Sequence, residues 1–127
     1  MPPLIYGQHA YHISIPTQTR KAADEQCHSL GGHILTLNSF EEMLFLKKLL
    51  GNRNVDLNTF QSWMEYKKFR GVFISQTHIP DFQFFRWWNT GYLQHDCAFF
   101  DTNTMEWRTT NCYRDKSVVC KNSGEKR

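Results

Sequence analysis

The chain has 127 residues, which is the size of one domain with one hydrophobic core. Its net charge is only +3, and its basic residues are dispersed, with the densest cluster at Lys67, Lys68 and Arg70. This composition argues against nucleic-acid binding, which needs several phosphate contacts aligned on one face, and no apolar run approaches the roughly 20 residues of a membrane span.

A first strand is expected near the start of the chain. Within residues 7–15, Tyr11, Ile13 and Ile15 lie on one side of a partly alternating pattern. Pro16 follows, and because proline cannot donate to a sheet ladder, we expect it to interrupt this strand.

A helix is predicted over residues 17–30. Ala23, Cys27 and Leu30 recur at positions i, i+4 and i+7, so they lie on one helical face. Gly31 begins a glycine pair that ends the helix, because glycine readily adopts the left-handed conformation that follows a helix C-terminus.

The second helix has the clearest local signature. Ser39 and Glu42 have the spacing of a capping box, in which the serine hydroxyl accepts from the amide three residues on and the glutamate reaches back to the serine amide. The apolar helix is predicted over residues 40–50, and Gly51 ends it.

No clean period appears between residues 60 and 88. A core strand is expected around Trp63 and Tyr66, and the apolar run that begins at Val72 is a second candidate for that strand. No linker, repeat or low-complexity tract divides the chain, so one domain is expected over residues 1–127, with its core at about 6–121 and a charged tail at 122–127.

Three of the four cysteines, Cys97, Cys112 and Cys120, lie in the final stretch of the chain, whereas Cys27 lies in the first predicted helix. Apolar β-formers beside the late cysteines, separated by polar turn residues, predict strands tied together at their ends. Four cysteines can pair in three ways, and spacing alone does not choose among them. An even count in a small chain favours two structural disulfides and an oxidising compartment.

Taken in order, these motifs resemble the C-type lectin-like domain family over most of the chain. The likeness rests on a helix with alanine, cysteine and a glycine pair, a capped apolar helix, a tryptophan-bearing core strand, a Trp-Asn-Thr-Gly segment, and a tryptophan between late cysteines. In this sequence these features are Ala23, Cys27, Gly31, Ser39, Trp63, residues 88–91, Cys97, Trp107, Cys112 and Cys120.

The resemblance implies an α+β fold in which two helices flank antiparallel sheets and a long loop region carries the binding site. It also implies that Cys27 pairs with Cys120 and that Cys97 pairs with Cys112. In the chain-entropy description, the outer bridge would contribute about 4 to 5 kcal/mol to stability because it closes a long loop.

Sugar-binding members of that family hold calcium with Glu-Pro-Asn, with a glutamate two residues before the third-from-last cysteine, and with Trp-Asn-Asp. Here the last motif is replaced by Trp107, Arg108 and Thr109, and His95 stands two residues before Cys97. Calcium takes six to eight oxygen ligands, several of them anionic, so an arginine opposes its binding. The sequence therefore predicts no sugar-binding calcium site and no cofactor, and leaves open a second calcium site elsewhere in the loop region.

Enzyme motifs are absent from the sequence, so we predict binding without turnover. His9 with His12, or His95 with Cys97, are interpreted as strand or loop residues rather than metal ligands.

The leading hypothesis is a calcium-independent protein-recognition module of an extracellular protein, either a receptor ectodomain or a soluble ligand. Interfaces favour Tyr, Trp, Phe and Arg at their centres, and these residues gather before Cys97. The predicted partner-binding residues are Tyr66, Lys67, Lys68, Phe69, Arg70, Phe82, Phe84, Arg86, Trp87, Tyr92 and Arg108.

Three alternatives stay open at this point. The aromatic residues before Cys97 can instead pack beneath a long loop. Trp87, Trp88 and Tyr92 can instead stack on a sugar, which would make the protein a calcium-independent carbohydrate-binding lectin. Many members of the family dimerise, so a homodimer is also open.

Overall fold

An eight-stranded sheet and two helices make up the part of the chain that the computed structural model describes. The described residues are 4–6, 9–69, 72–74 and 96–123. The backbone alone is described at residues 4–6, 67–69, 72–74 and 123. The elements are β1 (Leu4–Tyr6), β2 (His9–Gln18), α1 (Arg20–Ser29), β3 (His33–Ile34), α2 (Phe40–Asn52), β4 (Gln61–Phe69), β5 (Val72–Ile74), β6 (Cys97–Asp101), β7 (Glu106–Thr110) and β8 (Lys116–Ser123).

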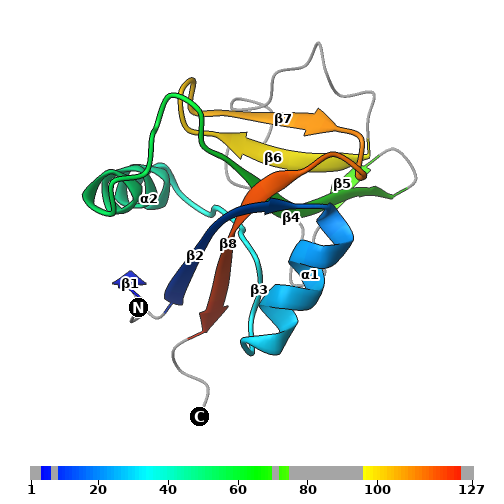
Figure 1. Cartoon of the computed structure of the whole chain (residues 1–127), viewed down its shortest axis with the longest axis horizontal. Coiled ribbons are helices and arrows are strands. Elements are labelled where there is room, and N and C mark those ends of the chain that lie inside the picture. Colours follow the sequence, from blue (N-terminus) through cyan, green and yellow to red (C-terminus); the bar gives the residue numbers. More distant parts are fainter. Residues whose placement is uncertain (1–3, 7–8, 70–71, 75–95, 124–127) are drawn as a thin grey trace.

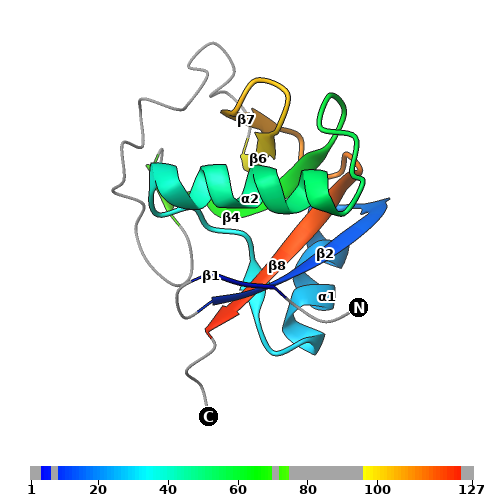
Figure 2. The same ribbon diagram turned by 90° about the vertical axis from the view of Figure 1, so that its left-hand side faces the viewer.

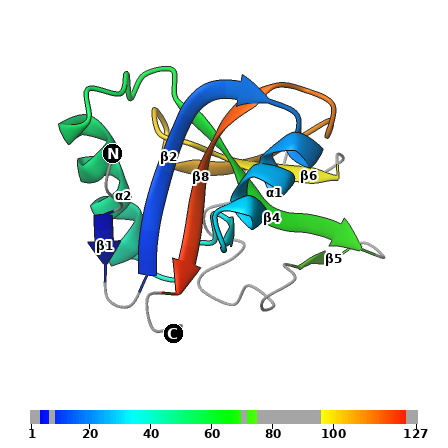
Figure 3. The ribbon, with the colours of Figure 1, turned by 60° about the horizontal axis from the view of Figure 1, so that its bottom comes forward.

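The sheet is mainly antiparallel and has the order β1-β2-β8-β4-β6-β7, with β3 also paired to β8 and β5 to β4. One pair, β4 with β8, is parallel. The long β2 and β8 strands lie side by side with α1 and α2 on opposite sides of them, and β6 and β7 form a hairpin beyond β4 (Figures 1 and 3). Because β2 lies near the start of the described fold and β8 lies at its end, their pairing brings the two ends of the domain together.

Pro16 was expected to interrupt the first strand, and it interrupts the regular pairing of β2 rather than the strand itself. The strand runs on to Gln18, and its pairing with β8 shifts register between Ser14 and Gln18. Pro16 lies inside this irregularity, where the ladder makes no regular pairs. Its missing N–H therefore costs the sheet no hydrogen bond, which is the usual way in which strands tolerate proline.

Helix α1 is shorter than the predicted helix because Thr19 caps it: the Thr19 side chain accepts from the Ala22 amide. Ala23 and Cys27 are fully buried, as their spacing predicted. Leu30 is not part of the buried face. It is the C-cap residue and keeps 44% of its surface exposed, because the chain turns away there toward β3.

Helix α2 begins at Phe40, as predicted, and the Ser39 hydroxyl accepts from the Glu42 amide at 3.0 Å. The second half of the predicted capping box is wrong, because the Glu42 carboxylate accepts from the Asn38 amide at 2.8 Å rather than from that of Ser39. The other oxygen of Glu42 contacts the Lys121 ammonium at 2.6 Å inside the protein. Figure 2 shows α2 lying across β4, and the contact with Lys121 joins α2 to β8.

The core lies between α2, α1 and the sheet. Trp63 on β4 is fully buried, and its indole N–H donates to the Gln18 carbonyl at 2.8 Å. Trp63 is thus in the core strand, and the run beginning at Val72 is the separate strand β5, paired to β4.

Both disulfides implied by the resemblance are present. Cys27 on α1 bridges to Cys120 on β8, and Cys97 at the start of β6 bridges to Cys112 after β7, each with 5.2 Å between the Cα atoms. The first bridge fixes a helix to the strand that ends the fold, and the second closes the open end of the β6–β7 hairpin. Together with the helices and the sheet, these bridges confirm the predicted α+β, C-type lectin-like fold.

Candidate functional site

Of the eleven residues predicted to bind a partner, Tyr66 and Arg108 have side chains that the structure describes. Three others are placed in β4 by their backbone alone, and the remaining six lie outside the described residues. The backbone-only residues are Lys67, Lys68 and Phe69, and the residues outside the described part are Arg70, Phe82, Phe84, Arg86, Trp87 and Tyr92.

Tyr66 is a core residue rather than a surface residue, which corrects its place in the predicted set. It has no exposed surface, and its ring stacks on Trp107 with 5.5 Å between centroids and 17° between planes. Its hydroxyl accepts from the Leu37 amide at 3.3 Å and lies 3.4 Å from the Leu37 carbonyl. A buried tyrosine needs such partners, and a binding partner cannot reach it there.

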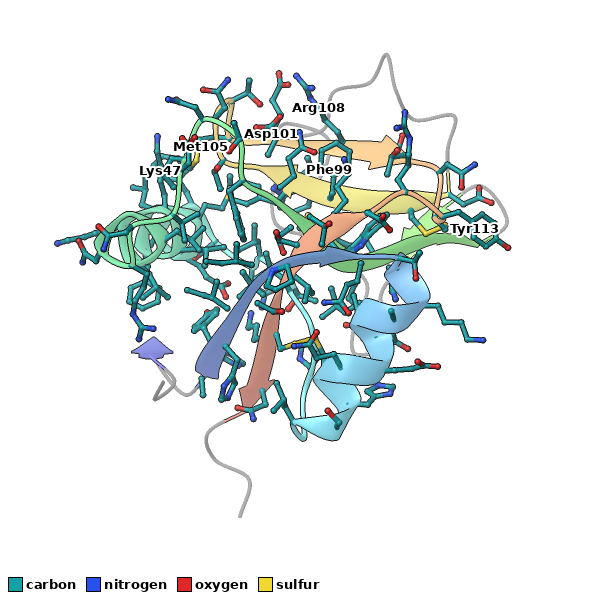
Figure 4. The ribbon with its side chains drawn as sticks, viewed as in Figure 1. Lys47, Phe99, Asp101, Met105, Arg108 and Tyr113 are labelled. Carbon is teal, nitrogen blue, oxygen red and sulfur yellow. A yellow bond between two sulfur atoms is a disulfide. The ribbon has the colours of Figure 1, made fainter. Side chains whose placement is uncertain are left out.

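Arg108 lies on the outer side of the β6–β7 hairpin, with 31% of its side chain exposed. It pairs across the hairpin with Phe99. Two positions along the hairpin Asp101 pairs with Glu106, so these four side chains share one face. The Arg108 guanidinium donates to Glu106 at 3.1 Å and lies 3.7 Å from the Asp101 carboxylate. Figure 4 shows Arg108 and Asp101 together at this outer face.

The same face continues onto β4 and β8. The amide nitrogen of Gln61 lies 3.5 Å from the Asp101 carboxylate, and the Gln61 oxygen accepts from the Lys116 ammonium at 2.6 Å. Lys116 also lies over the Phe99 ring, 4.2 Å from its centroid, which is a cation–π contact. We call this set of connected side chains the Arg108 face; it consists of Gln61, Phe99, Asp101, Glu106, Arg108 and Lys116.

The Arg108 face carries two cations, Arg108 and Lys116, and two carboxylates, Asp101 and Glu106. Burial lowers the pKa of Lys116, and the positive charges of Arg114 and Arg108 lower it further. The Arg108 guanidinium forms ion pairs with both carboxylates, Asp101 at 3.7 Å and Glu106 at 3.1 Å. A divalent cation would have to displace this internal cation to use either carboxylate as a ligand.

Thr109 replaces the last residue of the calcium-binding motif and lacks the carboxylate of that motif. It is 5% exposed, and its hydroxyl has no hydrogen-bond partner among the residues that the structure describes. Within those described residues, no cluster of three or more His, Cys, Asp or Glu side chains is arranged to hold a metal ion.

Gln61 and Lys116 belong to the Arg108 face although sequence reasoning did not select them. They are 55 residues apart in the chain and meet only because β8 runs parallel to β4. A local sequence pattern cannot predict such a contact, because the contact depends on the pairing of two strands in the folded protein.

Within the described helices, none is long and apolar enough to cross a membrane.

The comparison with known proteins agrees with this fold. Residues 17–122 match the family described as the Lectin C-type domain. The secretory phospholipase A2 receptor of Oryctolagus cuniculus is 26% identical over 126 residues, an alignment that covers 94% of this chain and 8% of the receptor. The chain thus spans a small part of the length of this relative.

Solved structures show the same architecture at low sequence identity. Human lithostathine superposes with a TM-score of 0.81 at 17% identity, covering 95% of this chain and 88% of that one. A calcium-independent type II antifreeze protein superposes with a TM-score of 0.76 at 19% identity, covering 94% and 90%. The family match, the shared fold and the two disulfides together show that this chain belongs to the C-type lectin domain family.

Proposed function

We propose that this domain recognises a protein partner without calcium, as part of a secreted or cell-surface protein. The observation that carries the proposal is the Arg108 guanidinium held between Glu106 and Asp101, at 3.1 and 3.7 Å. A built-in cation supplies the positive charge that a bound calcium ion would otherwise bring to these carboxylates. The binding surface is therefore complete without metal, and no catalytic step is required of it.

Two relatives support this setting. The related protein from Oryctolagus cuniculus is named as a receptor, and one of the structural neighbours is named as calcium-independent. Both facts belong to those proteins, and they make extracellular recognition without calcium a consistent assignment for this chain. The two disulfides agree with an oxidising compartment.

The Arg108 face has the chemistry of a protein interface. Arginine is enriched at the energetic centres of interfaces, and here its guanidinium is oriented by two carboxylates while remaining partly exposed. The Phe99 ring lies beneath Lys116 and adds an apolar surface to this face, with 5% of the residue exposed. A partner carboxylate or carbonyl would meet preorganised donors there, which lowers the entropic cost of binding.

The test is binding of the fluorescently labelled domain to intact cells, with chelator present throughout. A protein partner predicts that pretreating the cells with protease abolishes binding and that removing their glycans leaves it intact. The opposite pattern would overturn the proposal in favour of a calcium-independent lectin.

A matched pair of variants connects this assay to the Arg108 face. Arg108→Glu should weaken cell binding by about tenfold or more, as expected when a central interface arginine is reversed in charge. Lys48→Glu makes a similar charge change on an exposed position of α2 and should leave binding close to that of the wild type. Equal effects of both variants would mean that net charge, rather than this face, controls recognition.

A further inference from the structure

A pocket of about 360 Å³ lies at the start of α1, apart from the Arg108 face. It opens between the first turn of the helix and the loop after the second disulfide, and Figure 4 shows Tyr113 projecting outward beside this end of α1. The lining residues are Thr19, Arg20, Lys21, Asp24, Cys112 and Tyr113.

Arg20 is a buried cation in the wall of this pocket. It is 9% exposed, and one guanidinium nitrogen donates to the Glu65 carbonyl at 3.1 Å. Another nitrogen lies 3.6 Å from the Asp24 carboxylate, while Nε is buried with no hydrogen-bond partner among the described residues. Burial lowers the pKa of Arg20, although Asp24 and Glu65 act against that change. The guanidinium is thus incompletely compensated, and a nearby anion would stabilise it.

A second cation and the start of a helix also line the pocket. Lys21 is exposed beside Arg20, and the first turn of α1 contains no acidic residue. The N-terminal end of a helix carries a partial positive charge from its aligned peptide dipoles. Asp24 is the one carboxylate among the lining residues, and it already faces Arg20 and His28, at 3.6 and 4.0 Å.

Tyr113 stands on a loop that is held in place from several sides. The preceding residue, Cys112, is bridged to Cys97, and its carbonyl accepts from the Arg20 amide at 3.2 Å. The Asn111 side chain accepts from the Tyr113 amide at 2.8 Å. With 85% of its surface exposed, Tyr113 presents its aromatic side chain at the rim of the pocket from a backbone that is held in place. This combination is typical of interface hot spots, in which tyrosine and arginine are enriched.

We propose that this pocket is a second binding site, which takes a carboxylate side chain from an acidic polypeptide segment of a partner while Tyr113 packs against the neighbouring residue of that segment. The commitment to a carboxylate comes from charge complementarity, since two cations and a helix N-terminus face the pocket against one paired acid. The site is independent of the Arg108 face and can act together with it in one extended interface.

The experiment is an NMR titration of the isotope-labelled domain with an acetylated hexaglutamate amide. Amide shifts are expected in residues 19–24 and 111–114, and the uncharged hexaglutamine peptide should produce none. Lys21→Glu should weaken peptide binding by about tenfold and Tyr113→Ala by about fivefold. Both positions are exposed, so these variants keep the fold.

Lys48→Glu again serves as the matched control for charge, because Lys48 is exposed on α2 rather than at the pocket. It should leave the peptide affinity close to that of the wild type. The absence of shifts in residues 19–24 would overturn the proposal, and so would equal losses of affinity in Lys21→Glu and Lys48→Glu. Cell binding that depends on Arg108 is read out separately, so failure of this site and failure of the proposed function are distinguishable.

Discussion

Glu42 and Lys121 form an ion pair that is almost entirely enclosed, with side-chain exposures of 4% and 1%. The Lys121 ammonium also donates to the carbonyl and hydroxyl oxygens of Thr36, and the Tyr11 hydroxyl donates to Glu42. Burial lowers the pKa of Lys121, and Glu42 opposes that change. Such a pair contributes little net stability by itself, but removing one partner leaves the other charge unpaired in the core.

Lys121→Met should therefore lower the free energy of unfolding by about 3 to 5 kcal/mol, because Glu42 loses its counter-charge. The double variant Glu42→Gln/Lys121→Met should recover a large part of that loss, since the glutamine is neutral and can still accept from Asn38. Urea denaturation measures both values. Lys48→Met, an exposed position on α2, is the control and should be close to neutral. Additive losses in the double variant would contradict a coupled pair.

His9 on β2 confers a pH dependence on stability. Burial is the main cause that lowers its pKa below the ordinary 6.5, and the positive charge of Lys121 adds to it. Glu42 and the Asn122 backbone favour protonation, and His33 opposes it. The unfolded chain consequently takes up the His9 proton more readily than the folded chain does as the pH falls below 6.5.

The contribution of His9 is thus complete above pH 6.5 and is lost as the pH falls toward its lowered folded pKa. Replacing it with glutamine should reduce the fall in melting temperature between pH 7 and pH 5. His28→Gln, at an exposed position with 55% of the side chain accessible, is the matched control. An unchanged pH profile in His9→Gln would show that this histidine does not carry the dependence.

At the scale of single elements, the turn from α1 into β3 depends on two glycines for different reasons. Gly31 has a φ of +82°, which side chains rarely adopt. At Gly32 a Cβ atom would lie 2.5 Å from the Lys121 carbonyl oxygen and 2.8 Å from the Asn122 Cβ. Both of these atoms belong to β8. The backbone at residue 32 can approach β8 this closely only because glycine has no side chain.

Gly32→Ala should accordingly destabilise the fold by about 1 to 3 kcal/mol through overpacking against β8. Gly51 in α2 is the control, because a Cβ there would meet only the Leu57 side chain at an ordinary 3.6 Å. Gly51→Ala should be neutral or stabilising by up to about 1 kcal/mol, since alanine favours a helix. Urea denaturation measures the free energy of unfolding of both variants. Equal destabilisation would contradict the close approach of Gly32 to β8.

Sequence signals predicted the helices and strands best where the residues that determine an element lie close to it in the chain. Ser39 caps α2 as expected, and Ala23 and Cys27 form the buried face of α1. Sequence signals said less where a distant strand determines the structure. The strand continues past Pro16 because the register of its pairing with β8 shifts there, and the Glu42 carboxylate contacts Lys121 on β8 as well as its own helix end.

The candidate site was predictable only in part for the same reason. Arg108 was identified because it replaces a calcium ligand in a motif that is local in sequence, and the structure places it on an exposed face. Tyr66 was misassigned because an aromatic residue in a core strand has the composition of an interface residue. Lys116 was missed because its contacts with Gln61 and Phe99 depend on the order of strands in the sheet.

For the molecule as a whole, the two disulfides close loops of very different length, with sequence separations of 93 and 15 residues. Removing Cys27 and Cys120 together should cost about 4 to 5 kcal/mol, whereas removing Cys97 and Cys112 together should cost about 3 kcal/mol, because the longer loop constrains the unfolded chain more. Paired alanine substitutions and urea denaturation without reductant measure the difference. A larger loss from the Cys97–Cys112 pair would place the main constraint in the β6–β7 hairpin instead.

The most direct test of the proposed calcium-independent recognition is the Kd of the wild-type domain for the cells that it binds, measured in calcium and then in chelator. Because the Arg108 guanidinium already forms ion pairs with Asp101 and Glu106, the two values are predicted to be equal. Binding that disappears in chelator and returns with calcium would contradict this prediction.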